Sequence, residues 1–159
     1  MDTLRTLEID LENSEHQAIV LDLVCQFARV IMGAEPPEEK QRALIEGLAQ
    51  HPTTIILVAF HGERPAGIAI SFLGFSTFAA RPLINIHDFY VVEDLRGQGI
   101  GRALLEAIET KAKVLNCCKL TLEVEENNQR ALSLYHRFGF DCGQYDSEAG
   151  TVLFRQKKL

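Results

Sequence analysis

Three glycines at alternating positions, within Arg96-Gly97-Gln98-Gly99-Ile100-Gly101-Arg102, constrain this chain more than any other stretch. They follow an apolar, strand-like run from Leu83 to Val92 and precede an amphipathic, helix-like run from Ala103 to Leu115. A glycine-rich turn from a strand into a helix exposes backbone N–H groups, and the helix dipole favours an anion there. Taken alone, the stretch predicts a phosphate or pyrophosphate site and an ordinary tight turn about equally well.

The composition is that of an ordinary globular protein, and it limits the classes of partner. The chain has 159 residues, enough to bury a core in one domain without metal or disulfide links. A formal net charge of −6 argues against general nucleic-acid binding, which needs a basic face. The same charge is weakly favourable for a cationic small molecule.

The cysteines and the hydropathy pattern indicate where we expect the protein to work. No CxxC or Cys/His ligand spacing occurs, so we expect no metal site and reduced thiols. No apolar run reaches the length of a transmembrane helix, and no basic segment followed by a hydrophobic stretch opens the sequence. We therefore expect a cytoplasmic protein that does not bind membranes. The four cysteines are Cys25, Cys117, Cys118 and Cys142.

Helical spacing of apolar residues predicts two helices in the first third of the chain. A strand from Leu4 to Ile9 precedes the first helix, which begins at an Asn13 or Ser14 cap and ends at Gly33. Its apolar face would be Ile19, Val20, Leu23, Val24, Phe27, Val30 and Ile31. The second helix would cover residues 38–50, with Ala43, Leu44, Gly47 and Leu48 facing inward.

The middle of the chain predicts an antiparallel meander of three strands. They cover residues 53–61, 66–78 and 83–92, and turns at residues 62–65 and 80–82 join them. The first is apolar almost throughout, as expected for a strand buried on both faces. Gly67 and Gly74 in the second strand indicate bends or bulges.

The last third completes an α+β fold. After the glycine turn and its helix we expect a strand at 119–125, a helix from Gln129 to Phe138 and two final strands at 140–145 and 151–157. Asn127 or Asn128 would cap the last helix, and Gly139 would end it. The strand, glycine turn, helix and strand form a right-handed crossover. The prediction is a single domain over residues 1–159, with a mixed, mostly antiparallel sheet of about seven strands flanked by four helices.

Two common phosphate-binding motifs do not fit the glycine stretch. A dinucleotide-binding fold needs GxGxxG near the start of a parallel sheet, whereas these glycines lie late in the chain and follow a meander. A Walker loop needs Gly-Lys-Ser/Thr, which is absent.

Two blocks of residues together resemble the GCN5-related N-acetyltransferase (GNAT) superfamily. Asp88-Phe89-Tyr90-Val91, followed by Arg96 to Gly101, resembles the acetyl-CoA signature Arg/Gln-x-x-Gly-x-Gly/Ala at the end of the fourth strand. The second block comprises Val124, Asn128, Ala131, Leu134-Tyr135 and Phe138-Gly139-Phe140. The resemblance extends from about Thr54 to Phe140 and implies the acyl-CoA N-acyltransferase fold.

The resemblance implies how acetyl-CoA, the co-substrate, is held. The loop and the helix N-terminus would bind the pyrophosphate through main-chain N–H groups, and the pantetheine arm would pair with the fourth strand, which splays from the fifth. Arg102 could add charge, although a solvated helix residue is equally expected, and Asn128 either holds the pantetheine or only caps its helix. The implied residues are Phe89, Tyr90, Val91, Arg96, Gly97, Gln98, Gly99, Ile100, Gly101, Arg102 and Asn128.

The resemblance also implies the catalytic groups. Tyr135 occupies the family's general-acid position, although a tyrosine packed in the core is the plainer alternative. The sequence is most similar to the diamine (spermidine/spermine) acetyltransferase branch, in which a glutamate stands where this chain has His87. We expect His87 to be the general base, with a structural histidine as the alternative and Glu123 as a second candidate. Strict alternation would point His87 and Asp88 to opposite faces of their strand unless a bulge intervenes. The oxyanion donor would be a main-chain N–H near Tyr90 or Val91.

We therefore expect an N-acetyltransferase that transfers acetyl from acetyl-CoA to a small primary amine by direct attack in a ternary complex. The alternatives are acetylation of a protein or peptide and a CoA-binding regulatory module without turnover. The first two predicted helices, their connection at residues 34–39 with Glu35, Glu38 and Glu39, and the turn at 75–81 would surround the acceptor. A homodimer through residues 145–157 is possible.

Overall fold

A computed structural model describes residues 3–141 and 155–158 of the chain. The chain forms two compact units, Met1–Glu125 and Glu126–Leu159, which are described separately. The first unit contains β1 (Leu4–Glu8), α1 (Ser14–Met32), α2 (Glu38–Gln50), β2 (Thr54–His61), β3 (Arg64–Ser76), β4 (Arg81–Val91), the 3₁₀ turn η1 (Glu93–Leu95), α3 (Ile100–Val114) and β5 (Leu120–Leu122). The second contains α4 (Gln129–Phe138).

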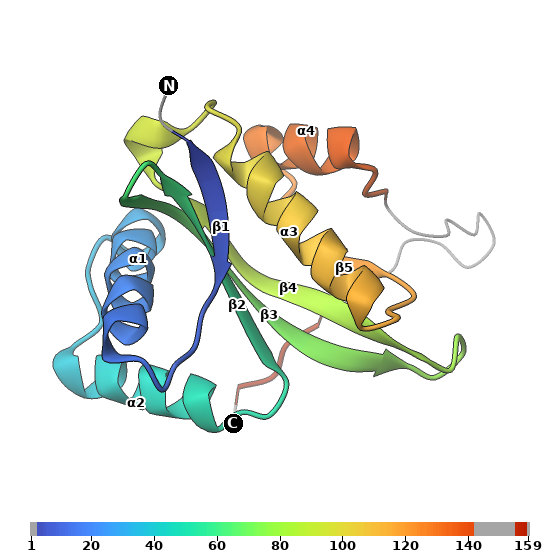
Figure 1. Ribbon diagram of the computed structural model, residues 1–159, viewed down its shortest axis with the longest axis horizontal. Helices are drawn as coiled ribbons and strands as arrows, with labels where there is room; N and C mark the ends of the chain where they lie inside the picture. The colour runs from blue at the N-terminus through green and yellow to red at the C-terminus, as the bar shows by residue number, and fades with distance from the viewer. Residues whose placement is uncertain (1–2, 142–154, 159) are drawn as a thin grey trace. The chain divides into compact units, whose positions relative to one another are not determined.

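The strands of the first unit form one sheet in the order β1-β2-β3-β4-β5 (Figure 1). The first four strands pair antiparallel, and β5 joins β4 in parallel. The expected mixed, mostly antiparallel sheet is thus confirmed, and the described residues hold four α-helices but five strands rather than about seven. Most of the two final predicted strands, and of the proposed dimer segment, fall within residues 142–154, outside the described residues.

The helices α1 and α3 cover opposite faces of this sheet. A Cβ built on Gly67 of β3 would lie 3.1 Å from Ile100 and 3.2 Å from Leu104, so Gly67 faces α3. The next residue, Ile68, pairs with Tyr90, whose ring stacks on Phe27 of α1 at 5.2 Å. Because successive strand residues point to opposite faces, α1 lies on the other side. Residues 55–60 of β2 are buried throughout, as predicted for a strand covered on both faces.

The helix ends follow the predicted capping chemistry, but two of the predicted buried faces are partly wrong. Asn13 accepts hydrogen bonds from the backbone of residues 15 and 16, and Gly33 ends α1 in the left-handed region. Val30 and Ile31 at the end of α1 are exposed. In α2 only Leu48 is buried, whereas Ala43 and Gly47 are exposed, because α2 packs mainly against α1 and not on the sheet.

One of the two bulges in the sheet lies where it was predicted, and the other does not. One lies near Gly67 as expected, where Ala59 pairs with Gly67 and Phe60 with Pro65. The other lies in β4, opposite Ile70 and Ser71 of β3, and not at Gly74. β5 is shorter than the predicted 119–125 strand and pairs only with residues 84–86 of β4. No helix in the described ranges is long and apolar enough to cross a membrane.

Candidate active site

The bulge in β4 lies at His87. Ile70 of β3 pairs with Asp88, and the next residue, Ser71, pairs with Ile86, so His87 is the extra residue on β4. An inserted residue disrupts the alternation of side chains along a strand. The bulge therefore decides which β4 side chains share a face.

His87 and Asp88 lie on the same face of the sheet. Asp88 pairs with Ile70 and Tyr90 pairs with Ile68, which places Asp88 on the face that α1 covers. The His87 ring contacts Phe72, two residues beyond Ile70 on this face, with the ring centroids 5.6 Å apart. The bulge that would bring the two side chains to one face is therefore present, and it resets the alternation between His87 and Asp88.

Burial gives Asp88 the electrostatic character of a proton acceptor. Asp88 is half-buried, and this desolvation raises the pKa of its carboxyl group, while neighbouring His87 opposes the shift. A raised carboxyl pKa makes the carboxylate a stronger base near neutral pH. His87 itself is exposed, and Phe72 lies between it and His51, whose ring centroid is 5.0 Å from that of Phe72.

The pairing of β4 with β5 stops directly before the bulge. The parallel register covers Ile84 to Ile86, and Asn85 donates a hydrogen bond to Thr121 Oγ1 at 3.0 Å. In the described part of the chain, no strand continues this pairing along residues 87–91. The two strands thus separate where the resemblance implies that the pantetheine arm enters.

The main-chain N–H and carbonyl groups of Val91 point to the edge of β4 that lies away from β3. Val92 N–H donates to the Ala66 carbonyl at 2.9 Å, towards β3, whereas the Val91 carbonyl accepts from Arg96 Nε at 3.0 Å. In an antiparallel pair, neighbouring residues direct their amide groups to opposite edges. The N–H of Val91, rather than that of Tyr90, is therefore the oxyanion donor that the geometry favours.

After β4 and η1, the glycine stretch forms a turn into α3. Gly97 and Gly99 have φ values of 82° and 85°, in the left-handed region that only glycine adopts readily. Gly99 is the N-cap of α3 and provides no side-chain hydrogen bond to the first turn. The first backbone N–H groups of the helix, at Ile100, Gly101 and Arg102, thus lack a side-chain cap and suit an anionic ligand.

Side chains around the turn hold it against the sheet. Arg64 at the start of β3 makes a two-pronged ion pair with Asp94 of η1, at 2.7 and 3.0 Å. Gln98 Nε2 donates a hydrogen bond to the Asp94 backbone carbonyl at 3.4 Å. Arg102 is bound to Glu106 at 2.7 Å and is largely exposed, so its side chain is already engaged within α3.

The C-terminal unit carries Tyr135 and Asn128 on α4. Tyr135 is 8% exposed, and burial raises its pKa to about 12, so its hydroxyl keeps its proton at neutral pH. Its ring packs edge-on against Phe140 at 5.7 Å. Asn128 caps α4 and accepts a hydrogen bond from Ala131 N–H at 3.2 Å, as predicted for a capping asparagine.

Glu123 has the weakest support of the predicted site residues. It follows the last residue of β5, is exposed and belongs to no strand. The structure records no contact between it and His87 or Asp88. Within residues 3–141 and 155–158, no three His, Cys, Asp or Glu side chains form a group that could hold a metal ion.

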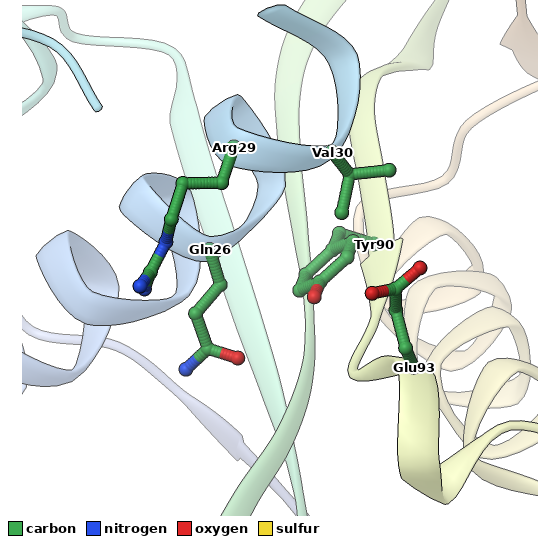
Figure 2. A pocket seen from close by; sticks show the side chains of 5 residues that line it. All are labelled: Gln26, Arg29, Val30, Tyr90 and Glu93. Carbon is green, nitrogen blue, oxygen red and sulfur yellow. The ribbon is translucent and has the colours of Figure 1, made fainter. Parts of the chain in front are cut away.

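A pocket of about 600 Å³ lies beside β4, on the face that α1 covers. Figure 2 shows Gln26, Arg29 and Val30 of α1 on one side and Tyr90 and Glu93 on the other. Of these five residues only Tyr90 was a predicted site residue, for its place beside the pantetheine arm, and Val30 was placed on the apolar face of the first helix. No local motif could have revealed the pocket, because it depends on how α1 packs against β4.

The chain belongs to the acetyltransferase (GNAT) family, whose model matches residues 19–140. This match includes both blocks on which the resemblance rests, and most of the sheet. Membership accounts for the separated strands β4 and β5 and for the glycine turn into α3.

Curated relatives include amine acetyltransferases. Spermine/spermidine N(1)-acetyltransferase of Bacillus subtilis is 34% identical over 70 residues, which are 43% of this chain and 46% of that protein. Thialysine N-epsilon-acetyltransferase of Caenorhabditis elegans is 25% identical over 135 residues, 83% of this chain and 81% of that protein. The chain thus spans less than half of the first relative and most of the second.

Solved structures share the fold over nearly the whole chain. A probable acetyltransferase superposes with a TM-score of 0.77 at 19% identity and covers 98% of this chain and 99% of its own. AAC(6')-Iy in complex with a bisubstrate analogue of CoA superposes with a TM-score of 0.74 at 16% identity, covering 99% of both chains. The family match thus assigns the chain to the acetyltransferases, and the solved structures show that it shares their fold.

Proposed function

We propose that this protein transfers the acetyl group of acetyl-CoA to a primary amine of a small molecule, by direct attack in a ternary complex. The relatives named for spermine, spermidine and thialysine all acetylate small amines, which supports this class of acceptor. The net charge of −6 is compatible with a cationic acceptor.

The uncapped N-terminus of α3 carries the proposal. Two glycines with positive φ lead into it, and its first N–H groups receive no side-chain hydrogen bond. We assign this turn to the pyrophosphate of acetyl-CoA, since backbone donors and the helix dipole both favour a phosphate there. The pantetheine arm would then run along residues 89–91, where β4 has separated from β5, towards the bulge at His87.

The side chains at the bulge would receive the proton that the amine loses. The amine nitrogen attacks the thioester carbonyl carbon, and the Val91 N–H stabilises the resulting oxyanion. Asp88 takes the amine proton, directly or through His87, and the C–S bond breaks. Tyr135 donates its proton to the leaving thiolate, a role that rests on its sequence motif and on the pKa of about 12 that keeps the hydroxyl protonated.

A turnover assay tests this function. Release of CoA thiol from acetyl-CoA is measured with polyamines, aminoglycosides, amino acids and peptides as acceptors. We expect acetylation of at least one small amine and a loss of kcat of about tenfold or more in Tyr135→Phe. Acetyl-CoA binding without turnover on any acceptor would instead identify a regulatory module. An unchanged rate in Tyr135→Phe would remove the acid assignment.

A further inference from the structure

The pocket between α1 and β4 contains an unsatisfied polar group. Tyr90 is 4% exposed, and in the part of the chain that the structure describes its hydroxyl has no hydrogen-bond partner. Its ring is fixed by stacking on Phe27 at 5.2 Å. Figure 2 shows the hydroxyl directed towards the Gln26 and Arg29 side of the pocket. The hydroxyl lines the pocket and makes no hydrogen bond to the described residues, so a ligand that hydrogen-bonds to it would gain affinity.

The remaining polar groups supply both kinds of hydrogen bond. Arg29 contacts Glu35 through Nε at 3.3 Å, and no described residue engages its two Nη groups. The amide nitrogen of Gln26 is bound to Asp22 at 2.8 Å, which leaves the amide oxygen as an acceptor. Glu93 adds a carboxylate that is 63% exposed. The pocket therefore presents donors at Arg29 and Tyr90 and acceptors at Gln26 and Glu93.

This combination matches the main-chain end of an amino acid. An α-carboxylate accepts from a guanidinium and a phenol hydroxyl, and a guanidinium is especially suited to carboxylates. An α-ammonium group donates to an amide oxygen and a carboxylate. A polyamine carries only ammonium groups. It would offer Arg29 no carboxylate, and its positive charges would be repelled by the guanidinium.

The pocket also lies at a suitable distance from the proton acceptor. Tyr90 and Asp88 are two residues apart on one face of β4, about 6.6 Å along the strand. In lysine, five bonds of about 1.5 Å separate Cα from the side-chain amine, a span of about 6 Å when extended. The pocket and Asp88 therefore lie close together on the same face of β4, which favours an acceptor that occupies the pocket with one end and presents a terminal amine to Asp88 with the other.

We propose that the acceptor is an α-amino acid whose side chain ends in a primary amine, recognised through its α-carboxylate by Arg29 and the Tyr90 hydroxyl. This inference rests on the proposed acetyltransferase function and specifies its substrate class. Arg29 and Tyr90 are then specificity-determining residues, and Asp88 receives the proton from the distal amine.

The test uses two acceptors that differ only in the α-carboxylate, L-lysine and its decarboxylated form cadaverine. The readout is the preference, the ratio of kcat/KM for lysine to kcat/KM for cadaverine. We expect the wild type to prefer lysine, and Arg29→Ala to reduce the preference about tenfold to a hundredfold, because a charge-assisted hydrogen bond is lost. Tyr90→Phe should reduce it about threefold to tenfold. Arg42→Ala, which changes an exposed arginine of α2, is the control and should keep the preference.

The outcomes separate this inference from the function on which it rests. Turnover of cadaverine or spermidine with no preference for lysine overturns the amino-acid proposal and leaves the acetyltransferase function intact. An equal effect of Arg29→Ala on both acceptors, or the same loss of preference in Arg42→Ala, also overturns it. Absence of acetyl transfer to every amine contradicts the proposed function itself. Circular dichroism of each variant identifies a loss caused by misfolding, and the Arg29→Lys variant, which keeps the charge, then replaces Arg29→Ala.

Discussion

The bulge in β4 and the glycine turn that follows this strand prepare different chemistry. The glycine turn presents main-chain N–H groups, and its geometry depends on two residues with positive φ. At the bulge, side chains do the work, and their character depends on the burial of Asp88 and on its neighbour His87. Binding of acetyl-CoA at the glycine turn should therefore be sensitive to an added Cβ. Proton transfer at the bulge should be sensitive to a changed charge.

The largest expected effect is at the bulge. Asp88→Asn removes the proposed proton acceptor and should lower kcat/KM by about a hundredfold or more, with little change in KM for acetyl-CoA. The wild-type rate should rise with pH through the raised pKa of Asp88, and this limb should be absent in the variant. Initial rates between pH 5 and pH 9 measure both.

His87→Ala distinguishes the two residues of the bulge. If His87 relays the proton, the variant loses most activity at low pH, where the least neutral amine is available. A pH profile that matches the wild type in Asp88→Asn and changes in His87→Ala would transfer the role of base to His87.

A smaller effect is expected from Gly97→Ala, which tests the glycine turn as the acetyl-CoA site. A Cβ at Gly97 would meet no atom within 4 Å, so the substitution strains only the backbone. The expected cost is about 1 kcal/mol, and it should raise KM for acetyl-CoA about fivefold while kcat changes little. Gly33→Ala at the end of α1 is a matched control, since Gly33 also has a positive φ of 75° and open space around it. An equal rise in KM in both variants would show that the turn has no special role.

The same Asp88→Asn variant should gain stability while it loses activity. Burial raises the pKa of Asp88 above its ordinary value of 3.8. Between that value and the raised pKa the folded protein binds more protons than the unfolded chain, so stability falls as pH rises through this window. Asparagine removes the buried charge, and we expect a higher urea midpoint at pH 7 and no difference below about pH 3. A lower midpoint at pH 7 would contradict the desolvation of Asp88.

The smallest effect should follow loss of the Arg64–Asp94 ion pair. Both side chains are more than half exposed, and solvent and salt screen an exposed ion pair so that it contributes little. Arg64→Ala should raise KM for acetyl-CoA about twofold at low salt, and 0.5 M NaCl should remove the difference. If the effect persists in salt, Arg64 acts through packing rather than charge.

Features encoded by local backbone chemistry were predictable from the sequence. Asn13 and Asn128 cap α1 and α4, Gly33 and Gly139 end them, and α2 and α4 have the predicted bounds. Each of these features depends on a few neighbouring residues. The glycine stretch also forms a local turn, since its first two glycines have positive φ. The order of the elements followed from apolar spacing, and the family followed from the two motif blocks.

Features that depend on packing between distant segments were not predictable. The bulge at His87 reflects the register of β3 against β4. It does not lie at Gly74, where a bend or bulge was expected. The first two helices were expected beside the acceptor, but nothing near Val30 and Ile31 indicated that the last turn of α1 would be exposed. The acceptor side of the protein, which needs the bulge and the pocket together, was therefore the less predictable half.

The most direct test of the central claim, that the glycine turn is the seat of the CoA pyrophosphate, is an NMR titration with CoA. The amide resonances of Gly97, Gly99, Ile100 and Gly101 should shift most, in a saturable way, and 3',5'-adenosine diphosphate should shift the same resonances. Gly33, which lies in a comparable left-handed turn, should shift little. Saturable binding of CoA that leaves the four turn amides unchanged would contradict the account.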